Sequence, residues 1–168
     1  MIQLKQFHSN SPIDFELLQR ALESAPDYWL RLTGKFPGSS AAAETFRALP
    51  DEKTASDKFV FGIFNGRELI GCADIVRGYP NSETAMLGLL LLGEAHQHRG
   101  IGRSAYEAIE DILNSWEKVR MVRIGVVAVN ESVLPFWKSL GFTETGVRRP
   151  YQDAGIISET IVLEKSLR

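Results

Sequence analysis

A glycine-bearing loop in the middle of the chain has the residue types that bind an anion. Residues 97–102 (QHRGIG) lie between an apolar stretch that ends at Leu92 and a stretch of helical periodicity that begins at Ile101. A glycine-rich turn from a strand into a helix directs several backbone N–H groups outward, and the positive end of the helix dipole adds to them. Arg99 and Arg103 can add charge-assisted hydrogen bonds. The loop therefore predicts a phosphate site, and the alternative is an ordinary strand-to-helix turn with two solvated arginines.

Two familiar phosphate loops do not match this segment. A P-loop needs G-x-x-x-x-G-K-[ST], and the glycine spacing before Arg103-Ser104 differs from it. A dinucleotide fingerprint needs a third glycine and a parallel β-α-β unit at the start of the fold, whereas this loop follows four predicted strands. We therefore expect a diphosphate that belongs to another kind of ligand.

Two motifs, in this order, carry a resemblance to a known family. Q-x-x-G-x-G at residues 97–102 resembles the motif with which the GCN5-related N-acetyltransferases (GNAT superfamily) bind the pyrophosphate of acetyl-CoA. N-x-x-V-x-x-F-W-x-x-x-G-F at residues 130–142 is similar to the family segment N-x-x-A-x-x-F-Y-x-x-x-G-F. One predicted helix and one predicted strand separate the two motifs, and the predicted element order agrees with the family roughly from Phe59 to the C-terminus.

The resemblance implies acetyl-CoA as co-substrate, held in a V-shaped gap between the strand that ends near Leu92 and the strand at residues 121–129. Backbone groups of Leu90 and Leu92 would pair with the pantetheine arm as an added strand would. Asn130 would hydrogen-bond the arm, although its position also suits a helix N-cap. The remaining cofactor residues that the resemblance implies are Gln97, His98, Arg99, Gly100, Ile101, Gly102 and Arg103 around the pyrophosphate, and Ser132 or Phe136 as further contacts.

The resemblance also implies direct transfer of an acetyl group from the thioester to a primary amine in a ternary complex. Such transfer needs no enzyme nucleophile, so Cys72 is expected to be a small buried side chain. A backbone N–H near Leu92 would polarise the thioester carbonyl. Trp137 stands where the family often has a tyrosine that protonates the departing thiolate, and an indole N–H is not a useful acid. Trp137 would instead shape the tunnel or donate to the sulfur. Tyr151 is a replacement candidate for the acid, with structural packing as its alternative.

The residues do not single out a general base. Glu83 at the start of the apolar strand is the candidate that we name, and Asp74 on the neighbouring strand is a second. The alternative for both carboxylates is a solvated strand end. His96 and His98 flank the glycine loop, so they would more naturally contact phosphate or solvent.

The stretch from Tyr28 to Lys53 is the least regular part of the chain, and in this family that region covers the acceptor side. The residues that would line an acceptor pocket or attract a cation are Tyr28, Trp29, Phe36, Glu44, Asp51 and Glu52. The alternative is that the aromatic side chains seal the core beneath a loop. The sequence does not select among a polyamine, an aminoglycoside, an amino acid and a protein amino terminus.

Composition limits the partners. The chain has 168 residues, 44% of them hydrophobic, and a formal net charge of -2, which fits one globular domain over residues 1–168. This charge balance gives no support for a nucleic-acid or membrane partner. A lone cysteine, the lack of zinc-type spacing and the lack of a signal-peptide pattern indicate a reduced, cytoplasmic protein without a metal. The sequence leaves a homodimer open.

Hydrophobic periodicity and turn residues place these motifs on elements. We expect a mixed α/β (α+β) fold whose six- to seven-stranded, mostly antiparallel sheet is flanked by helices. The first expected helix has Ser11 as its N-cap and Pro12 at its first position. The expected strands are residues 2–7, 59–64, 69–76, 85–92, 121–129, 142–147 and 156–163, and the other expected helices cover residues 40–49, 101–116 and 132–140.

Two other functions stay open: a non-catalytic CoA-binding module, and an acyltransferase that uses another acyl-CoA or an oxygen acceptor.

Overall fold

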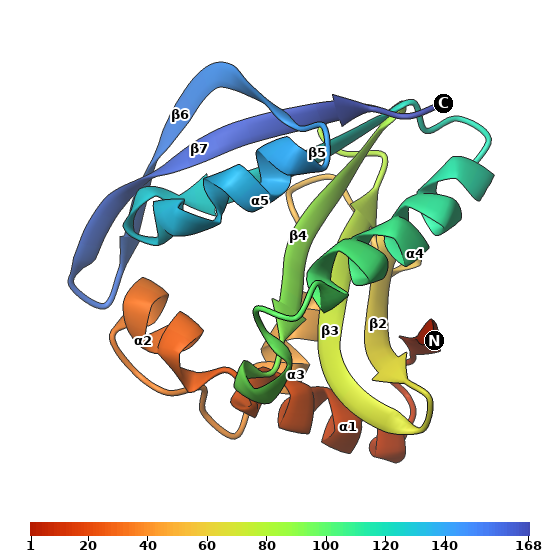
Figure 1. Cartoon of the computed structure of the whole chain (residues 1–168), viewed down its shortest axis with the longest axis vertical. Coiled ribbons are helices and arrows are strands. Elements are labelled where there is room, and N and C mark those ends of the chain that lie inside the picture. Colours follow the sequence, from red (N-terminus) through yellow and green to blue (C-terminus); the bar gives the residue numbers. More distant parts are fainter.

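A seven-stranded mixed sheet runs through the molecule (Figure 1). The computed structural model describes all residues from Met1 to Arg168. The strands lie in the order β1-β2-β3-β4-β5-β7-β6, and every neighbouring pair is antiparallel except β4 and β5. Their bounds are Ile2–Phe7 (β1), Lys58–Asn65 (β2), Glu68–Arg77 (β3), Thr84–Leu92 (β4), Met121–Val127 (β5), Thr143–Asp153 (β6) and Ile156–Ser166 (β7). The predicted fold class is confirmed.

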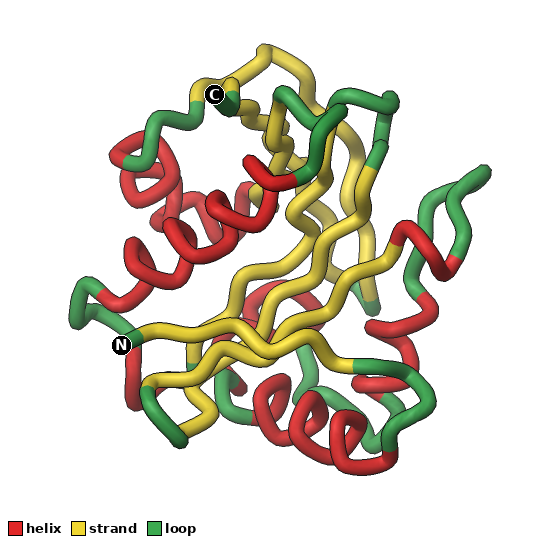
Figure 2. Tube along the Cα trace, turned by 90° about the vertical axis from the view of Figure 1, so that its right-hand side faces the viewer, coloured by secondary structure: helices red, strands yellow, loops and turns green.

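Two groups of helices cover opposite faces of the sheet, as the view in Figure 2 shows. Helices α4 (Ile101–Ser115) and α5 (Leu134–Ser139) contribute to one buried cluster. Helices α1 (Pro12–Glu23), α2 (Pro26–Thr33) and α3 (Ala41–Arg47) surround the other. Ser11 caps α1 by accepting from the Asp14 N–H at 3.3 Å, and Pro12 occupies the first turn, as predicted.

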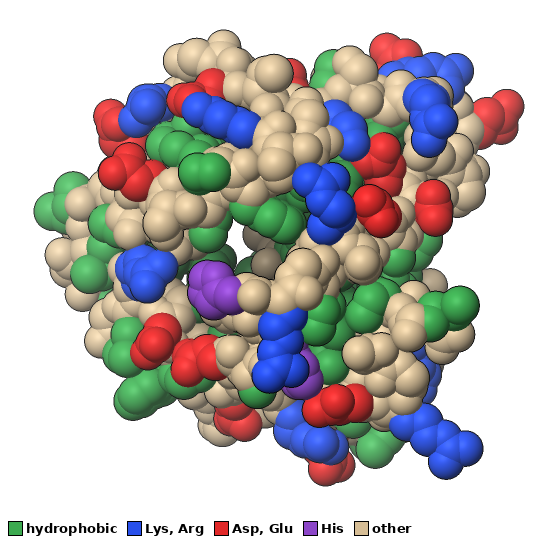
Figure 3. All heavy atoms as spheres, in the orientation of Figure 1, with side chains coloured by type: hydrophobic (Ala, Val, Ile, Leu, Met, Phe, Trp, Pro, Cys, Tyr) green, Lys and Arg blue, Asp and Glu red, His purple; other side chains and the backbone are tan.

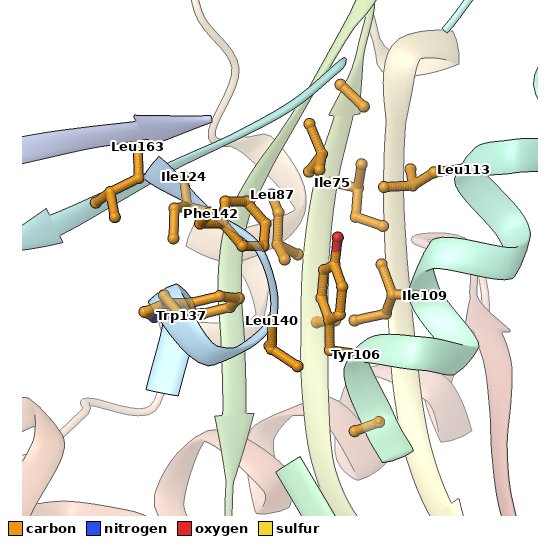
Figure 4. Close-up of a cluster of buried hydrophobic side chains, with 14 of the residues drawn as sticks. Ile75, Leu87, Tyr106, Ile109, Leu113, Ile124, Trp137, Leu140, Phe142 and Leu163 are labelled. Atoms are coloured by element: carbon orange, nitrogen blue, oxygen red, sulfur yellow. The ribbon is translucent and has the colours of Figure 1, made fainter. Parts of the chain in front are cut away.

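The larger core lies beneath α4 and α5. Figure 4 shows Tyr106 from α4 and Trp137 from α5 on either side of Phe142, with aliphatic side chains of the sheet around them. The apolar strand β4 serves both cores, because Leu87 faces the α4 side and Leu91 faces the α1 side. This explains why its sequence is apolar almost throughout, as in a strand buried on both faces.

The sheet is split where β4 meets β5. These parallel strands pair only from Thr84 to Met86 on β4 and from Met121 to Arg123 on β5, and then diverge. In the space-filling view the molecule is hollowed between β4 and α5 (Figure 3). The far half of β4 therefore has no strand beside it on the β5 side.

Several predicted boundaries differ from the structure. The strands predicted at residues 59–64 and 69–76 extend by one residue each at their hairpin, because Asn65 pairs with Glu68 and only Gly66-Arg67 form the turn. β5 ends at Val127, since Ala128–Val133 forms a 3-10 turn (η3) before α5. The strand predicted at residues 142–147 continues to Asp153. β6 is an edge strand whose residues are almost all exposed, so it lacks the apolar alternation that marks a strand.

Candidate functional site

The glycine loop presents a row of backbone N–H groups that have no acceptor in the protein. Helix α4 begins after Gly100, which has a φ of 76°, and no side chain caps the helix. Its first turn carries no acidic residue. The N–H groups of residues 98–103 make no hydrogen bond to backbone or side chain. Such groups at a helix N-terminus suit an anion, so the predicted phosphate residues lie together in a suitable arrangement.

Left-handed backbone shapes this loop. His98 has a φ of 61° and Gly100 a φ of 76°. Non-glycine residues rarely adopt this region, and glycine does so without a steric penalty. A Cβ added to Gly100 would meet nothing within 4 Å, so the space beside it is open. The loop is thus preformed and accessible from outside.

Three side-chain contacts fix the loop between β4 and α5. The Gln97 Nε2 donates to the Leu92 carbonyl at 2.8 Å, so Gln97 ties the loop to the end of β4. Arg103 donates to the Ser139 carbonyl at 3.2 Å and to its hydroxyl at 3.1 Å. A Cβ on Gly102 would lie 3.2 Å from the Phe136 ring, so glycine lets α4 approach α5 closely. Arg99 is exposed and makes no ion pair or hydrogen bond.

Backbone groups of Leu90 and Leu92 point into the split of the sheet. The Gly93 N–H donates to the Ile70 carbonyl at 2.8 Å, which makes these two residues a hydrogen-bonded antiparallel pair. Such pairs alternate with non-hydrogen-bonded ones. The registers Gly71↔Leu92 and Ala73↔Leu90 therefore turn the N–H and carbonyl groups of both leucines away from β3. They face the side that β5 leaves open.

Asn130 is buried beside the split, and it is not a helix cap. It has non-helical dihedral angles within η3, and α5 has no side-chain cap. Its Oδ1 accepts from Arg31 Nη1 of α2 at 2.8 Å. Ser132 is exposed and makes no side-chain hydrogen bond, whereas Phe136 packs edge-on against Trp137 with ring centroids 5.1 Å apart.

Trp137 is a core residue. Its side chain is 9% exposed, and its ring lies 5.2 Å from Phe142 and 6.1 Å from Tyr106, both edge-on. Figure 4 shows the indole filling the space between α5 and the sheet. This placement favours packing over the direct contact with sulfur considered from the sequence.

The base candidates lie far apart. Glu83 precedes β4 at the closed end of the split, where its carbonyl accepts from the N–H groups of Arg120 and Met121. All nine residues of β4 lie between Glu83 and the glycine loop, roughly 30 Å of strand, so Glu83 is at the end of the split remote from the loop. His96 lies in the 3-10 turn between β4 and the glycine loop, with its Nε2 3.5 Å from the Glu68 carboxylate.

Asp74 lies beside an irregularity in β4. The register shifts between Asp74↔Leu89 and Ile75↔Leu87, so Gly88 is an extra residue in the strand. A Cβ on Gly88 would lie 3.7 Å from the Asp74 carboxylate. Lys58 contacts both carboxylate oxygens, at 2.7 and 2.8 Å. Burial raises the pKa of Asp74, and the Lys58 charge opposes that shift.

The residues predicted for the acceptor side lie in different surroundings. Tyr28 lies against the smaller core, and burial raises its pKa to about 12, helped by Tyr151 and Cys72. The Tyr151 hydroxyl donates to the Leu32 carbonyl at 2.7 Å, which joins β6 to α2. Trp29 donates to the Leu22 carbonyl at 2.8 Å. The other predicted side chains, Phe36, Glu44, Asp51 and Glu52, are exposed.

Sequence reasoning missed three contributors. Arg31 and Lys58 are charged residues whose partners are 99 and 16 positions away, so no local pattern marks them. The Gly88 bulge had one local signal, a glycine inside an apolar strand.

Cys72 is fully buried, as expected from the sequence, and burial raises the pKa of its thiol to about 12.

Neither a metal nor a membrane span is indicated by the geometry. No three His, Cys, Asp or Glu side chains lie close enough together to hold a metal ion. No helix has both the length and the apolar run that crossing a bilayer requires.

Solved structures share this fold over nearly the whole chain. An acetyltransferase from Thermus thermophilus is 28% identical, with 98% of this chain and 97% of that chain covered and a TM-score of 0.73. A GNAT family acetyltransferase from Elizabethkingia anophelis with acetyl-CoA bound is 19% identical, with 99% and 98% covered and a TM-score of 0.63. Spermidine N-acetyltransferase from Vibrio cholerae, in complex with CoA and spermine, is 12% identical, with 98% and 95% covered and a TM-score of 0.73.

Sequence comparison names the family. No curated protein sequence matches the chain. A family model, however, covers most of it, including the glycine loop and the segment that begins at Asn130. The chain belongs to the acetyltransferase (GNAT) family, whose model matches residues 16–142.

Proposed function

We propose that the protein is an N-acetyltransferase that moves the acetyl group of acetyl-CoA directly onto a primary amine. The observation that carries this proposal is the row of free N–H groups at residues 98–103, next to an unpaired edge of β4. A diphosphate fits the first feature. An extended arm with amide groups fits the second, because it can hydrogen-bond to a strand edge.

The residues present define a path for the co-substrate. Residues 98–103 would hold the pyrophosphate, and the backbone groups of Leu92 and then Leu90 would pair with the pantetheine arm. An arm that runs in this direction continues toward the bulge at Gly88. The backbone of the bulge is therefore a better candidate than Leu92 for polarising the carbonyl, as an oxyanion hole does. Bound acetyl-CoA would supply an acetyl group activated as a thioester.

Asp74 is the base that this path favours. It lies beside Gly88 and has a raised pKa, which suits a group that must accept a proton near neutral pH. Asp74 would take the proton from the ammonium form of the acceptor. The free amine then forms the N–C bond as the C–S bond breaks, and the proton that the nitrogen loses on becoming an amide passes through water to the departing thiolate. Cys72 takes no part, because burial raises the pKa of its thiol to about 12.

An acetyl-transfer assay tests this function. Release of free thiol from acetyl-CoA is followed with spermine, an amino acid and a short peptide as acceptors, and the products are identified by mass. Spermine is included because the Vibrio cholerae structure contains it. We expect turnover and an N-acetylated product with at least one acceptor. CoA binding without any turnover would favour a non-catalytic module. An ester product would favour an acyltransferase with an oxygen acceptor, and preference for a longer acyl-CoA would favour one with a different acyl donor.

Asp74→Asn tests the base. We expect kcat/KM to fall about 100-fold or more, as for loss of a general base. In the wild type kcat/KM should decline as pH falls through the pKa of Asp74, which lies above the ordinary value for an aspartate because of burial. This acidic limb should vanish in the variant. An unchanged pH profile would remove Asp74 from the mechanism.

A further inference from the structure

Arg31 on α2 makes a hydrogen bond of an unusual kind for an arginine. Its Nη1 donates to Asn130 Oδ1 at 2.8 Å, across 99 positions of sequence. No carboxylate lies within ion-pair distance of its guanidinium. The charged group is thus directed at a neutral amide rather than at an opposite charge.

This contact determines which way the Asn130 amide points. A guanidinium only donates hydrogen bonds, so the atom of Asn130 that faces Arg31 must be the oxygen. The NH2 group then points away from Arg31. It makes no hydrogen bond within the protein, although it is not sealed from solvent. Asn130 therefore presents two free donors just beyond the end of β5, the strand that borders the split.

Helix α2 holds Arg31 in place from both ends. At its start, the Asp27 N–H donates to Glu94 at 3.0 Å. Glu94 belongs to the 3-10 turn Glu94–His96 (η2), which leads directly into the phosphate-binding loop. Near its end, the Leu32 carbonyl accepts from the Tyr151 hydroxyl at 2.7 Å. Figure 1 shows α2 beneath the tip of the β6–β7 hairpin. The position of Arg31 is thus tied to the stem of the loop and to the hairpin.

We propose that Arg31 is a positioning residue that acts through Asn130. By fixing the amide oxygen, Arg31 turns the NH2 group toward the split, where it donates to an amide carbonyl of the pantetheine arm. The inference rests on the proposed use of acetyl-CoA. The arm offers carbonyl acceptors, and a donor in a fixed orientation loses less entropy on binding than a free rotor. Arg31 itself touches neither co-substrate nor acceptor in this account.

Binding of CoA, measured by calorimetry, tests the proposal without any need for turnover. Arg31→Met removes the donor but keeps most of the side-chain length, and we expect it to weaken CoA binding about 5- to 10-fold, the worth of one hydrogen bond. Arg31→Lys should retain part of the effect. Asn130→Asp keeps an acceptor for Arg31 but loses the NH2 group, so it should bind CoA at least as weakly as Asn130→Ala. Arg20→Met, on the exposed side of α1 and without a polar contact, is the matched control and should bind like the wild type.

The double variant Arg31→Met/Asn130→Ala separates positioning from independent contacts. If Arg31 acts through Asn130, the double variant binds CoA as weakly as Asn130→Ala alone, within about twofold. With an amine substrate, KM for acetyl-CoA should rise while kcat stays near the wild-type value. The proposal would be overturned if the loss of CoA affinity in the double variant equalled the product of the losses in the two single variants. It would also be overturned if Arg31→Met bound CoA like the wild type but had a raised KM for the amine. A wild type that does not bind CoA would instead overturn the proposed function, and this inference with it.

Discussion

The two sides of the split sheet are held in different ways. The proposed cofactor side consists of the far half of β4, residues 97–103, α4 and α5, and it rests on the large core that contains Tyr106 and Trp137. The proposed acceptor side consists of α2, α3 and the β6–β7 hairpin. Helices α2 and α3 pack against the smaller core, and a hydrogen bond from Tyr151 to Leu32 joins the hairpin to α2.

This difference fits the roles that we propose for the two sides. Phosphate and amide groups are the same in every acetyl-CoA, so backbone N–H groups and a rigid core can recognise them. An acceptor varies from one enzyme to another, and side chains on short helices and an edge hairpin can be exchanged without disturbing the core. We therefore expect stability to reside on the cofactor side and substrate selection on the acceptor side.

The largest expected effect is on the core of the cofactor side. Trp137→Ala removes a ring that packs against Tyr106 and Phe142, and we expect a loss of about 3–5 kcal/mol in the free energy of unfolding. Urea denaturation measures it. Phe36→Ala is the acceptor-side control: Phe36 is 63% exposed, so the change should be within about 0.5 kcal/mol. Equal losses in both variants would remove the distinction between the two sides.

The next effect concerns the free N–H groups of the glycine loop at residues 98–103. Gly102→Glu places a carboxylate among the free N–H groups, and its Cβ would lie 3.2 Å from the Phe136 ring. Loss of the charge-assisted hydrogen bonds should weaken CoA binding by at least about 100-fold in calorimetry. Gly38→Glu is the control, because its Cβ would meet nothing within 4 Å. Retained affinity in Gly102→Glu would mean that the pyrophosphate lies elsewhere.

The smallest effect is on the acceptor side. Tyr151→Phe removes the hydrogen bond to Leu32 and should cost about 1 kcal/mol of unfolding free energy. Because the hydroxyl is already engaged and burial raises its pKa, we expect kcat to change by no more than about twofold. A kcat lowered about 100-fold with unchanged stability would instead identify Tyr151 as the general acid.

The sequence predicts the cofactor side better than the acceptor side for physical reasons. The glycine loop and the apolar strand before it are local features, and their residue types follow from backbone geometry and burial. Arg31, Lys58 and Tyr151 act through partners distant in sequence, which only the folded chain brings near. Glu83 illustrates the same limit: the pattern puts a carboxylate at the start of the apolar strand, and only the pairing of β4 with β5 shows that this is the closed end of the split.

Amide hydrogen exchange with and without CoA tests whether the split between β4 and β5 holds acetyl-CoA. We expect CoA to slow exchange at residues 98–103 and at Leu90 and Leu92, whose N–H groups have no acceptor in the protein or face the split. Amides of Ile70 and Cys72 on β3 serve as internal references. Tight CoA binding that leaves residues 98–103 and both leucines unprotected would mean that the co-substrate binds elsewhere.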